Sequence, residues 1–417
     1  MKKKNTIFVQ MAAYSDPELV PTVKDLFKQA KYPDRIKVCI CWQHKPEEEI
    51  DELQDDDRIS IIDVPHLETK GVCWARNLIQ KQYDGETYTL QLDSHHRFEK
   101  NWDEICIGIM KDLKAAGYRK PILTAYMPSY DPPNDPEGRA TEPWQLAFDR
   151  FTPQGAVFFK PEGIANWRTR KLPPMTRWFS AHFAFADGIM CKEVPHDPNY
   201  WFHGEEISIA ARAYTHGYDL FAPHKMIAYH EFTRQYRGPK VWDDQPDKSI
   251  DLDNSSLLRN RKLFEMDGEK NDLDWGEYGF GNKRTLRDYE KYAGICFSKR
   301  AIQQETLDNT EAPNPTYESE EEWENSLCSL FKHCVDISYD SVPLDDYHFW
   351  CVVFMDENGN EIYREDASDE EIKRMKNDPD GYCKLWRTFE TNKKPASWMV
   401  WPNSHSQGWQ NQIQGNL

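Results

Sequence analysis

The first third of the chain alternates short apolar runs with amphipathic stretches of helical spacing. Apolar residues at every third or fourth position predict helices that cover a core, and short apolar runs bounded by turn residues predict strands. Strands that alternate with helices predict a mostly parallel, doubly wound α/β sheet with helices on both faces. The strand–helix pairs are 5–14 with 18–30, 35–44 with 46–54, 58–65 with 69–85, and 87–93 with 101–117, followed by a strand at 120–127.

In sheets of this kind, ligands bind beyond the carboxyl ends of the strands. The residues at or just after those ends are Ala13, His44, His66 and Asp93, so we expect a ligand site among them. The chain contains neither GxGxxG nor GxxxxGK. It therefore lacks the usual dinucleotide-binding and P-loop motifs.

The pattern changes after Ser129. Pro-rich and charged residues between 129 and 178 predict loops over a site, and strand and helix character returns between 179 and 233. Residues 250–310 are mostly helical and charged, whereas the tail has two β-rich runs joined through the turn sequence DENGN. We expect three parts, namely an α/β domain over 1–240, a helical extension and linker over 241–325, and a small β-rich C-terminal domain over 326–417.

The 417 residues include 52 Lys and Arg against 70 Asp and Glu, which gives a net charge of −18. Such a chain repels polyanions, so we expect no nucleic-acid partner, and a phosphate ligand needs local positive charge, for which a metal is one source. No apolar run reaches the ~18–20 residues of a membrane-spanning helix, and the first residues lack a signal-peptide pattern. The 10 cysteines include no CxxC pair, which indicates reduced thiols and a cytoplasmic protein.

The sequence LQLDSHHRF ends a predicted strand with an acidic residue and two histidines. Asp93 and His95 are two positions apart, so on an extended strand end both side chains point to the same side. A carboxylate oxygen and an imidazole nitrogen suit manganese or a similar divalent ion, although Asp and His also occur together on surfaces by chance. A later strand ends in His230, a candidate third ligand.

The sequence WFHGEEISIAARAY begins a predicted helix with the paired acids Glu205 and Glu206. The helix dipole favours acidic residues at this end without any catalytic role, and from the residues alone that explanation stays open. A metal with three protein ligands at Asp93, His95 and His230 would keep coordination positions open for diphosphate oxygens.

These motifs resemble those of nucleotide-sugar transferases of GT-A fold. LQLDSHHRF and the region from WFHGEE to YH resemble the metal and catalytic motifs of polypeptide N-acetylgalactosaminyltransferases, and more closely those of the cytoplasmic hydroxyproline N-acetylglucosaminyltransferase family. GVCWARN, VPHDPNYWFHGEE and YGFGNKRTLRDYEKYAGICF extend the second resemblance, which covers roughly residues 5 to 300. The resemblance implies a GT-A catalytic domain over 1–240 and an accessory role for the β-rich tail.

The resemblance also implies roles for individual residues. It implies Mn2+, or another divalent cation, bound by Asp93, His95 and His230, and it makes Glu205 and Glu206 the catalytic pair, with Glu205 facing the sugar or the acceptor. FADGIM stands where the galactosaminyltransferases carry a Gly-Gly pair beside the donor sugar. The nucleotide-sugar-binding residues that it implies are Ala13, Tyr14, Arg76, Asp93, Gly188, Arg234 and Tyr236.

The implied function is retaining transfer of a sugar, N-acetylglucosamine, from a UDP-sugar donor to a hydroxyl of a protein or glycan acceptor. One alternative is a metal-dependent hydrolase that uses Asp93, His95 and His230 to activate water. Another is a non-catalytic carbohydrate-binding protein, which the 15 tryptophans would suit. The tail either packs on the catalytic domain or binds the acceptor through tryptophans, namely Trp398, Trp401 and Trp409.

Overall fold

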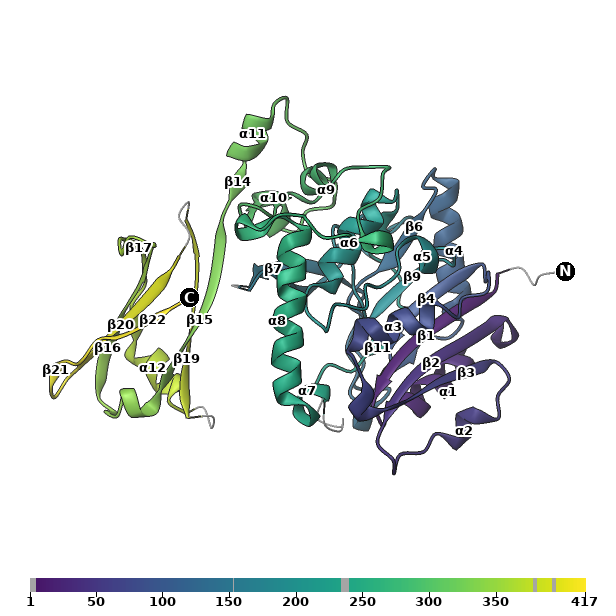
Figure 1. The fold of residues 1–417 in the computed structure, drawn as a ribbon, viewed down its shortest axis with the longest axis horizontal. Helices are drawn as coiled ribbons and strands as arrows, with labels where there is room; N and C mark the ends of the chain where they lie inside the picture. Colours follow the sequence, from purple (N-terminus) through teal and green to yellow (C-terminus); the bar gives the residue numbers. More distant parts are fainter. Residues whose placement is uncertain (1–4, 153, 234–239, 378–380, 392–394) are drawn as a thin grey trace.

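The computed structural model describes residues 5–152, 154–233, 240–377, 381–391 and 395–417. Its centre is a seven-stranded sheet in the order β10-β6-β9-β4-β1-β2-β3 (Figure 1). Neighbouring strands run parallel except at β9, which is antiparallel to both β4 and β6. The mostly parallel α/β sheet predicted from the sequence is confirmed. Its strands are β1 (Ile7–Tyr14), β2 (Ile36–His44), β3 (Ile59–Pro65), β4 (Tyr88–Asp93), β6 (Pro121–Thr124), β9 (Phe183–Asp187) and β10 (Asp219–Phe221).

Helices cover both faces of this sheet because side chains alternate along its strands. Val9 and Met11 of β1 share a core with residues of α1 (Leu19–Gln29) and α4 (Trp102–Ala115). Phe8 points to the other face, where it packs with residues of α3 (Val72–Gln80). The remaining helices of this part are α2 (Asp51–Gln54), α5 (Met190–Glu193) and α6 (Glu205–Thr215).

Two small antiparallel pairs lie outside the main sheet. β5 (His96–Phe98) follows β4 closely and pairs with β11 (Ala228–His230), which brings a strand from far along the chain beside the end of β4. The Pro-rich segment predicted as loops contains a hairpin, β7 (Trp144–Phe151) with β8 (Val157–Gly163). Phe148 and Val157 of this hairpin are buried in the main core, which explains why the segment is ordered.

The segment 241–325 packs against the α/β unit. Leu263 and Tyr289 lie in the same hydrophobic core as the main sheet, so this segment extends that unit. Thr285 begins α9 with a capping box in which its hydroxyl accepts from the Asp288 amide and its own amide donates to the Asp288 carboxylate. The boundaries at 240 and 325 stay predictions. The elements are α7 (Val241–Asp244), α8 (Pro246–Leu263), α9 (Leu286–Ala293), β12 (Ile295–Cys296), β13 (Ala301–Gln303), α10 (Gln304–Leu307), α11 (Glu320–Asn325) and β14 (Leu327–Cys328).

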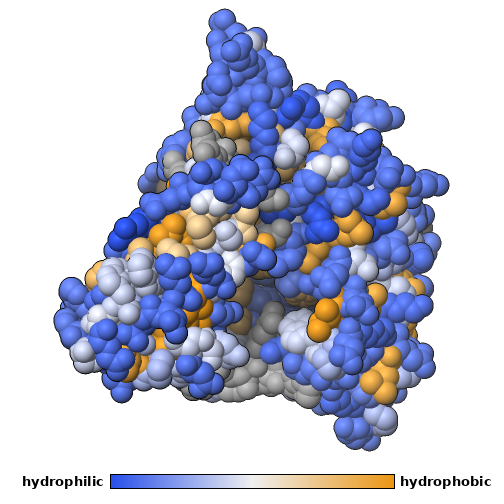
Figure 2. Space-filling view, turned by 60° about the vertical axis from the view of Figure 1, so that its left-hand side comes forward, coloured by the Kyte–Doolittle hydropathy of each residue, from blue (hydrophilic) through white to orange (hydrophobic). Residues whose placement is uncertain are grey.

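The tail is β-rich, as predicted, and forms two antiparallel sheets around a core of its own. Turn residues 356–360 join β16 to β17, and the Asp356 carboxylate accepts from the amides of Asn358 and Asn360. In Figure 1 these sheets stand beside α8. The face of the molecule shown in Figure 2 is mostly hydrophilic and is hollowed between two lobes. The elements are β15 (Leu330–Ser338) with β19 (Tyr382–Glu390), then β16 (Tyr347–Met355), β17 (Glu361–Arg364), β18 (Ala367–Ser368), α12 (Asp369–Met375), β20 (Ser397–Ser404), β21 (Gly408–Trp409) and β22 (Ile413–Asn416).

Short 3-10 helices complete the fold. They are Pro33–Arg35, His66–Glu68, Pro132–Asn134, Met266–Gly268, Gly276–Tyr278 and Tyr339–Ser341.

Within the described ranges, no helix is long and apolar enough to cross a membrane.

Candidate active site

Three side chains, which we call the metal triad, converge at the carboxyl end of β4. Asp93 ends β4, His95 follows two positions later, and His230 ends β11, which pairs with β5. Their ligand atoms lie within 4.8 Å of one another. The Nε2 atoms of His95 and His230 are 3.0 Å apart, and Asp93 Oδ2 lies 3.8 Å from the first and 3.6 Å from the second. The structure thus brings together the three residues predicted as metal ligands.

The spacing and charge of the triad fit a divalent cation. Two ligands ~2.1 Å from an ion are ~3.0 Å apart at a right angle, which the two histidine nitrogens match, and ~3.4 Å apart at the tetrahedral angle, which the Asp93 distances of 3.6 Å and 3.8 Å exceed slightly. Burial holds the pKa of His230 well below its usual range, so its neutral ring can offer a lone pair. Burial opposes ionisation of Asp93, but His230 and Arg76 outweigh it and hold its pKa well below the usual value. Two nitrogens and one carboxylate oxygen suit a first-row divalent metal such as manganese.

Asp16 holds the other side of the His95 ring. Its Oδ2 lies 2.7 Å from His95 Nδ1 and accepts from the Ser94 hydroxyl at 2.6 Å. Burial opposes ionisation of Asp16, but the hydrogen bond from His95 outweighs it and lowers the pKa of Asp16. An ionised Asp16 keeps the proton on Nδ1 and leaves Nε2 for an ion. The sequence prediction missed Asp16, although an acid two positions after a strand at the ligand-binding edge is a signal for it.

Arg76 connects the triad to the acidic helix. It lies in the second turn of α3, which begins after Gly71, where φ is 100° and an added Cβ would lie 2.6 Å from the Trp201 carbonyl oxygen. The buried guanidinium donates from Nη2 to Asp93 Oδ1 at 3.0 Å and from Nη1 to Glu205 Oε1 at 3.3 Å. One cation therefore orients a carboxylate of the triad and a carboxylate of α6.

Glu205 and Glu206 open α6 and line a cavity of about 320 Å³ together with Asp93 and His230. Glu206 accepts from the Ala181 amide at 2.8 Å, and its other oxygen accepts from the Tyr126 hydroxyl at 3.3 Å. Burial raises the pKa of Glu205, and burial together with the neighbouring Glu205 raises the pKa of Glu206 to about 8. The pair thus has specific contacts beyond those of surface acids at a helix end, and a carboxyl that titrates near neutral pH can exchange protons.

A second cavity, of about 160 Å³, opens on the β1 side of the triad and shares Arg76 and Asp93 with the first. Tyr14 lines it, and its hydroxyl donates to Asp244 at 2.8 Å. Ala13, which was predicted to bind there, has its side chain buried in the main core, because residues alternate along β1. Ala12 faces the cavity in its place. The other walls include Gln43, Thr69, Trp201, Phe202 and Trp242.

Gly188 does not reach this site. Its amide donates to the Thr87 carbonyl at 3.0 Å, just before β4 begins, whereas the triad lies where β4 ends. The reason is that β9 runs antiparallel to β4, which carries Gly188 to the opposite edge of the sheet. An added Cβ there would lie 2.2 Å from the Glu86 carbonyl oxygen, so close packing explains the glycine. The other two residues predicted to bind the nucleotide sugar, Arg234 and Tyr236, lie outside the described residues.

Aromatic rings that the sequence did not indicate surround His230. His182 stacks on it with ring centres 4.2 Å apart, and Phe232 meets it edge-on at 4.3 Å. His182 Nε2 accepts from the Met127 amide at 2.8 Å, and burial holds the pKa of His182 well below its usual range. These rings fix the orientation of His230. No sequence signal could have found His182, because it meets His230 only in the folded chain, whereas Phe232 lies two positions after His230.

Fold and site together define an α/β protein with a metal-type Asp-His-His triad at the edge of the sheet where such folds bind ligands. The chain belongs to the family described as Glycosyltransferase (GlcNAc), which matches residues 6–56 and 48–299. The matched region contains the triad, Arg76 and the Glu205–Glu206 pair. The predicted class, a glycosyltransferase of the GlcNAc type, is confirmed. No curated protein matches the chain.

Solved structures show weaker likenesses. The structure of GalNAc-T7 with UDP, GalNAc and Mn2+ is 13% identical over 68% of this chain and 54% of its own, with a TM-score of 0.46, so this chain spans about half of that protein's length. The structure of S. aureus TarS with UDP-GlcNAc is 13% identical over 61% of this chain and 67% of its own, with a TM-score of 0.36. Another TarS structure matches 99% of this chain and 77% of its own at 10% identity, with a TM-score of 0.36. At these scores we assign nothing to this chain from them.

Proposed function

We propose that this glycosyltransferase moves N-acetylglucosamine from UDP-N-acetylglucosamine to a hydroxyl of a protein or glycan acceptor, with retention of configuration and with Mn2+ or another divalent cation. The observation that carries the proposal is the convergence of Asp93, His95 and His230 beside Arg76 and a buried acidic pair. The name of the family supports the donor sugar. Family membership also favours transfer over the hydrolase and the non-catalytic alternatives.

Asp93, His95 and His230 would hold the cation. When bound, such an ion neutralises the charge that develops on a diphosphate leaving group. Arg76 keeps Asp93 oriented and adds a fixed positive charge to the same side of the cavity. Asp16 keeps the His95 ring in the orientation and tautomer that direct Nε2 toward the triad.

In the proposed step, the bond between the anomeric carbon and the diphosphate oxygen breaks, and the acceptor oxygen bonds to the same face of the sugar. The acceptor proton passes to the departing diphosphate oxygen, so UDP and the glycosylated acceptor form. Glu205, whose carboxylate Arg76 holds at 3.3 Å, binds hydroxyls of the sugar or the acceptor and forms no covalent bond. Glu206 supports the cavity wall through the Ala181 amide and the Tyr126 hydroxyl.

We also propose a cytoplasmic location. The ten cysteines include no CxxC pair, and eight of the ten are buried. Reduced thiols of this number suit a reducing compartment. Thiol labelling in intact cells, compared with labelling after lysis, tests this location, and extracellular labelling of the protein would contradict it.

The experiment that tests the function is UDP release from a panel of UDP-sugars, with Mn2+ and with a chelator, in the presence of mixed protein and glycan acceptors. We expect release from UDP-N-acetylglucosamine that needs the metal, and an α-linked product by proton NMR when the donor is α-linked. Inversion at the anomeric carbon would overturn the retaining mechanism. Metal-dependent release of the free sugar in water, with no product on any acceptor, would favour the hydrolase instead.

A further inference from the structure

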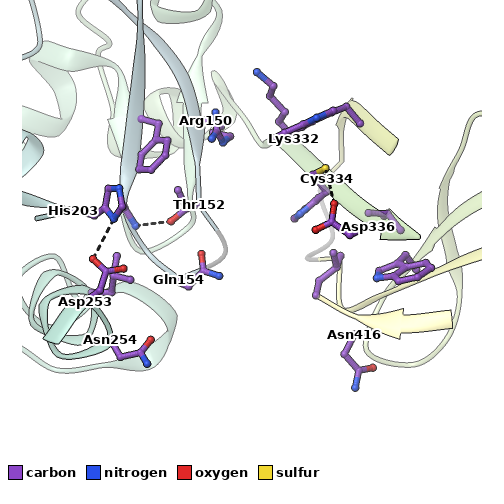
Figure 3. A pocket seen from close by; sticks show the side chains of 18 residues that line it. Arg150, Thr152, Gln154, His203, Asp253, Asn254, Lys332, Cys334, Asp336 and Asn416 are labelled. Carbon is purple, nitrogen blue, oxygen red and sulfur yellow. Dashed lines mark hydrogen bonds and ion pairs between the residues drawn. The ribbon is translucent and has the colours of Figure 1, made fainter. Parts of the chain in front are cut away.

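A third cavity, of about 580 Å³, lies between the α/β unit and the C-terminal sheets (Figure 3). We call it the inter-sheet groove. Arg150 and Thr152 of the β7–β8 hairpin and Asn254 of α8 stand on one wall, and Lys332 and Asp336 of β15 stand on the other. The groove therefore exists only because the C-terminal sheets lie beside the α/β unit.

The groove adjoins the cavity of the candidate active site. Phe158 and His203 line both the groove and the cavity that contains the triad and the acidic pair. His203 comes two positions before Glu205, and its Nδ1 lies 3.1 Å from Asp253 Oδ1 of α8. A molecule bound in the groove would thus approach the acidic pair past these two side chains.

The chemistry of the walls favours a neutral, hydroxyl-rich ligand. Among the described lining residues, two charged side chains are basic and two are acidic, and both basic ones, Arg150 and Lys332, also pair with Asp149, so the walls carry no surplus of positive charge. Gln154 and Asn254 each present an amide, which can donate and accept as sugar hydroxyls do.

The groove also offers aromatic surface. Trp386 of β19 lines it and is 45% exposed, although Arg150 and Lys332 stand over its ring at 5.6 Å and 5.5 Å from the ring centre, and Trp398 lines it as well. An exposed indole presents a flat apolar face, against which the C–H face of a sugar ring can pack. Aromatic rings combined with side-chain amides and with basic groups that already have acidic partners suit an oligosaccharide better than a charged peptide.

We propose that the inter-sheet groove binds the acceptor, that the acceptor is a neutral oligosaccharide, and that its terminal hydroxyl enters the active site past Phe158 and His203. The proposal rests on the proposed function and deepens it by assigning the acceptor class and a role to the C-terminal sheets. It places acceptor recognition on both walls, so that neither part of the chain suffices alone.

The test is direct binding to the full chain, measured by calorimetry without any donor. The probes are the tetrasaccharides of glucose, mannose and N-acetylglucosamine, and peptides that contain serine, threonine or hydroxyproline. We expect at least one tetrasaccharide to bind, and Trp386→Ala and Asn254→Ala each to weaken that binding about tenfold. Trp386→Phe, which keeps a ring, restores most of it. The matched control is Tyr382→Ala, since Tyr382 is 48% exposed on the same strand, β19, and is not among the residues that line the groove.

Donor-dependent UDP release is measured in parallel, so that failure of the groove and failure of the proposed function are distinguished. Oligosaccharide binding that neither variant changes would overturn the groove as its site. Binding of peptides alone, weakened by Trp386→Ala, would overturn the acceptor class and make the groove a peptide site. Oligosaccharide binding sensitive to both variants, without any UDP release, would leave the groove supported and the proposed reaction refuted.

Discussion

Asp16 Oδ2 lies 2.7 Å from His95 Nδ1, and both side chains are buried. The contact joins the residue just after the first strand to a residue just after the fourth, across the carboxyl edge of the sheet. A buried carboxylate in this position decides which ring nitrogen carries the proton. It therefore prepares His95 to bind an ion through Nε2, although Asp16 itself does not belong to the triad.

The first prediction is that Asp16→Asn weakens Mn2+ binding about 10-fold to 100-fold. The amide keeps the size of the side chain but loses the charge that holds the Nδ1 proton. The measurement is a calorimetric titration with Mn2+. Asp57→Asn, which changes an exposed acid, is the control and should bind Mn2+ like the unchanged protein. Equal affinity in Asp16→Asn and the control would contradict the orienting role.

The second prediction concerns Asp93. Asp93→Ala should abolish metal-dependent UDP release while the chain stays folded, because the triad loses its only anionic member and Arg76 still has Glu205. Asp63→Ala is a matched control, since Asp63 lies 3.1 Å from His44 in an Asp–His pair at the same edge of the sheet. Release in both variants at the rate of the unchanged protein would overturn the metal site.

Sequence alone predicted the parts of this site that depend on local order. Asp93 and His95 lie at the end of a strand that the alternation of apolar runs already indicated, and their spacing of two gives them a common side. The convergence of His230 depends on the pairing of β11 with β5, which is a long-range contact that no local pattern encodes. His230 could be named as a candidate only because it also ends a strand.

The direction of β9 explains why Gly188, predicted to bind the nucleotide sugar, lies away from the site. The sequence showed a strand before Gly188, and nothing in its residues distinguishes a strand that runs parallel to β4 from one that runs antiparallel. Because β9 is antiparallel, the start of the strand, beside Ala181 and His182, lies near the triad, and its end at Asp187 lies opposite Tyr88. The side chain of Ala13 misses the cavity by a single position, because neighbouring residues of a strand face opposite sides of the sheet.

The third prediction is that Arg76→Leu destabilises the protein by about 3 kcal/mol. Arg76 is 4% exposed and is held between Asp93 and Glu205, so its removal leaves two carboxylates near each other without their shared cation. Arg76→Lys should have a free energy of unfolding between those of the unchanged protein and Arg76→Leu. Its ammonium group keeps the charge but lacks the fork that reaches both carboxylates. Urea unfolding measures the free energies.

The control for Arg76 is Arg119→Leu, which removes the same charge from an exposed position. It should change the free energy of unfolding by less than about 0.5 kcal/mol. If Arg76→Leu and Arg119→Leu unfold at the same urea concentration, the Arg76 cation is not needed to hold the two carboxylates together.

The fourth prediction is a pH dependence that Glu206 causes. Its pKa is raised from the usual value near 4.5 to about 8, chiefly by burial and then by Glu205. Between these values the folded chain binds a proton that the unfolded chain releases, so stability falls as the pH rises from about 4.5 through about 8. Glu206→Gln keeps the shape of the protonated form and cannot ionise. We expect the unchanged protein to lose about 2 to 3 kcal/mol more than this variant between pH 6 and pH 8.5.

Unfolding is measured at both pH values in the presence of a chelator, because a bound cation would also stabilise ionised acids in the cavity. Glu104→Gln on α4 serves as the control, since Glu104 is exposed and should follow the pH profile of the unchanged protein. An equal loss of unfolding free energy in Glu206→Gln and the control between pH 6 and pH 8.5 would contradict the prediction. That result would show that Glu206 is already ionised in the folded protein. In that case the Ala181 amide and the Tyr126 hydroxyl would hold it as a carboxylate, and burial would not have made it an acid that exchanges protons near neutral pH.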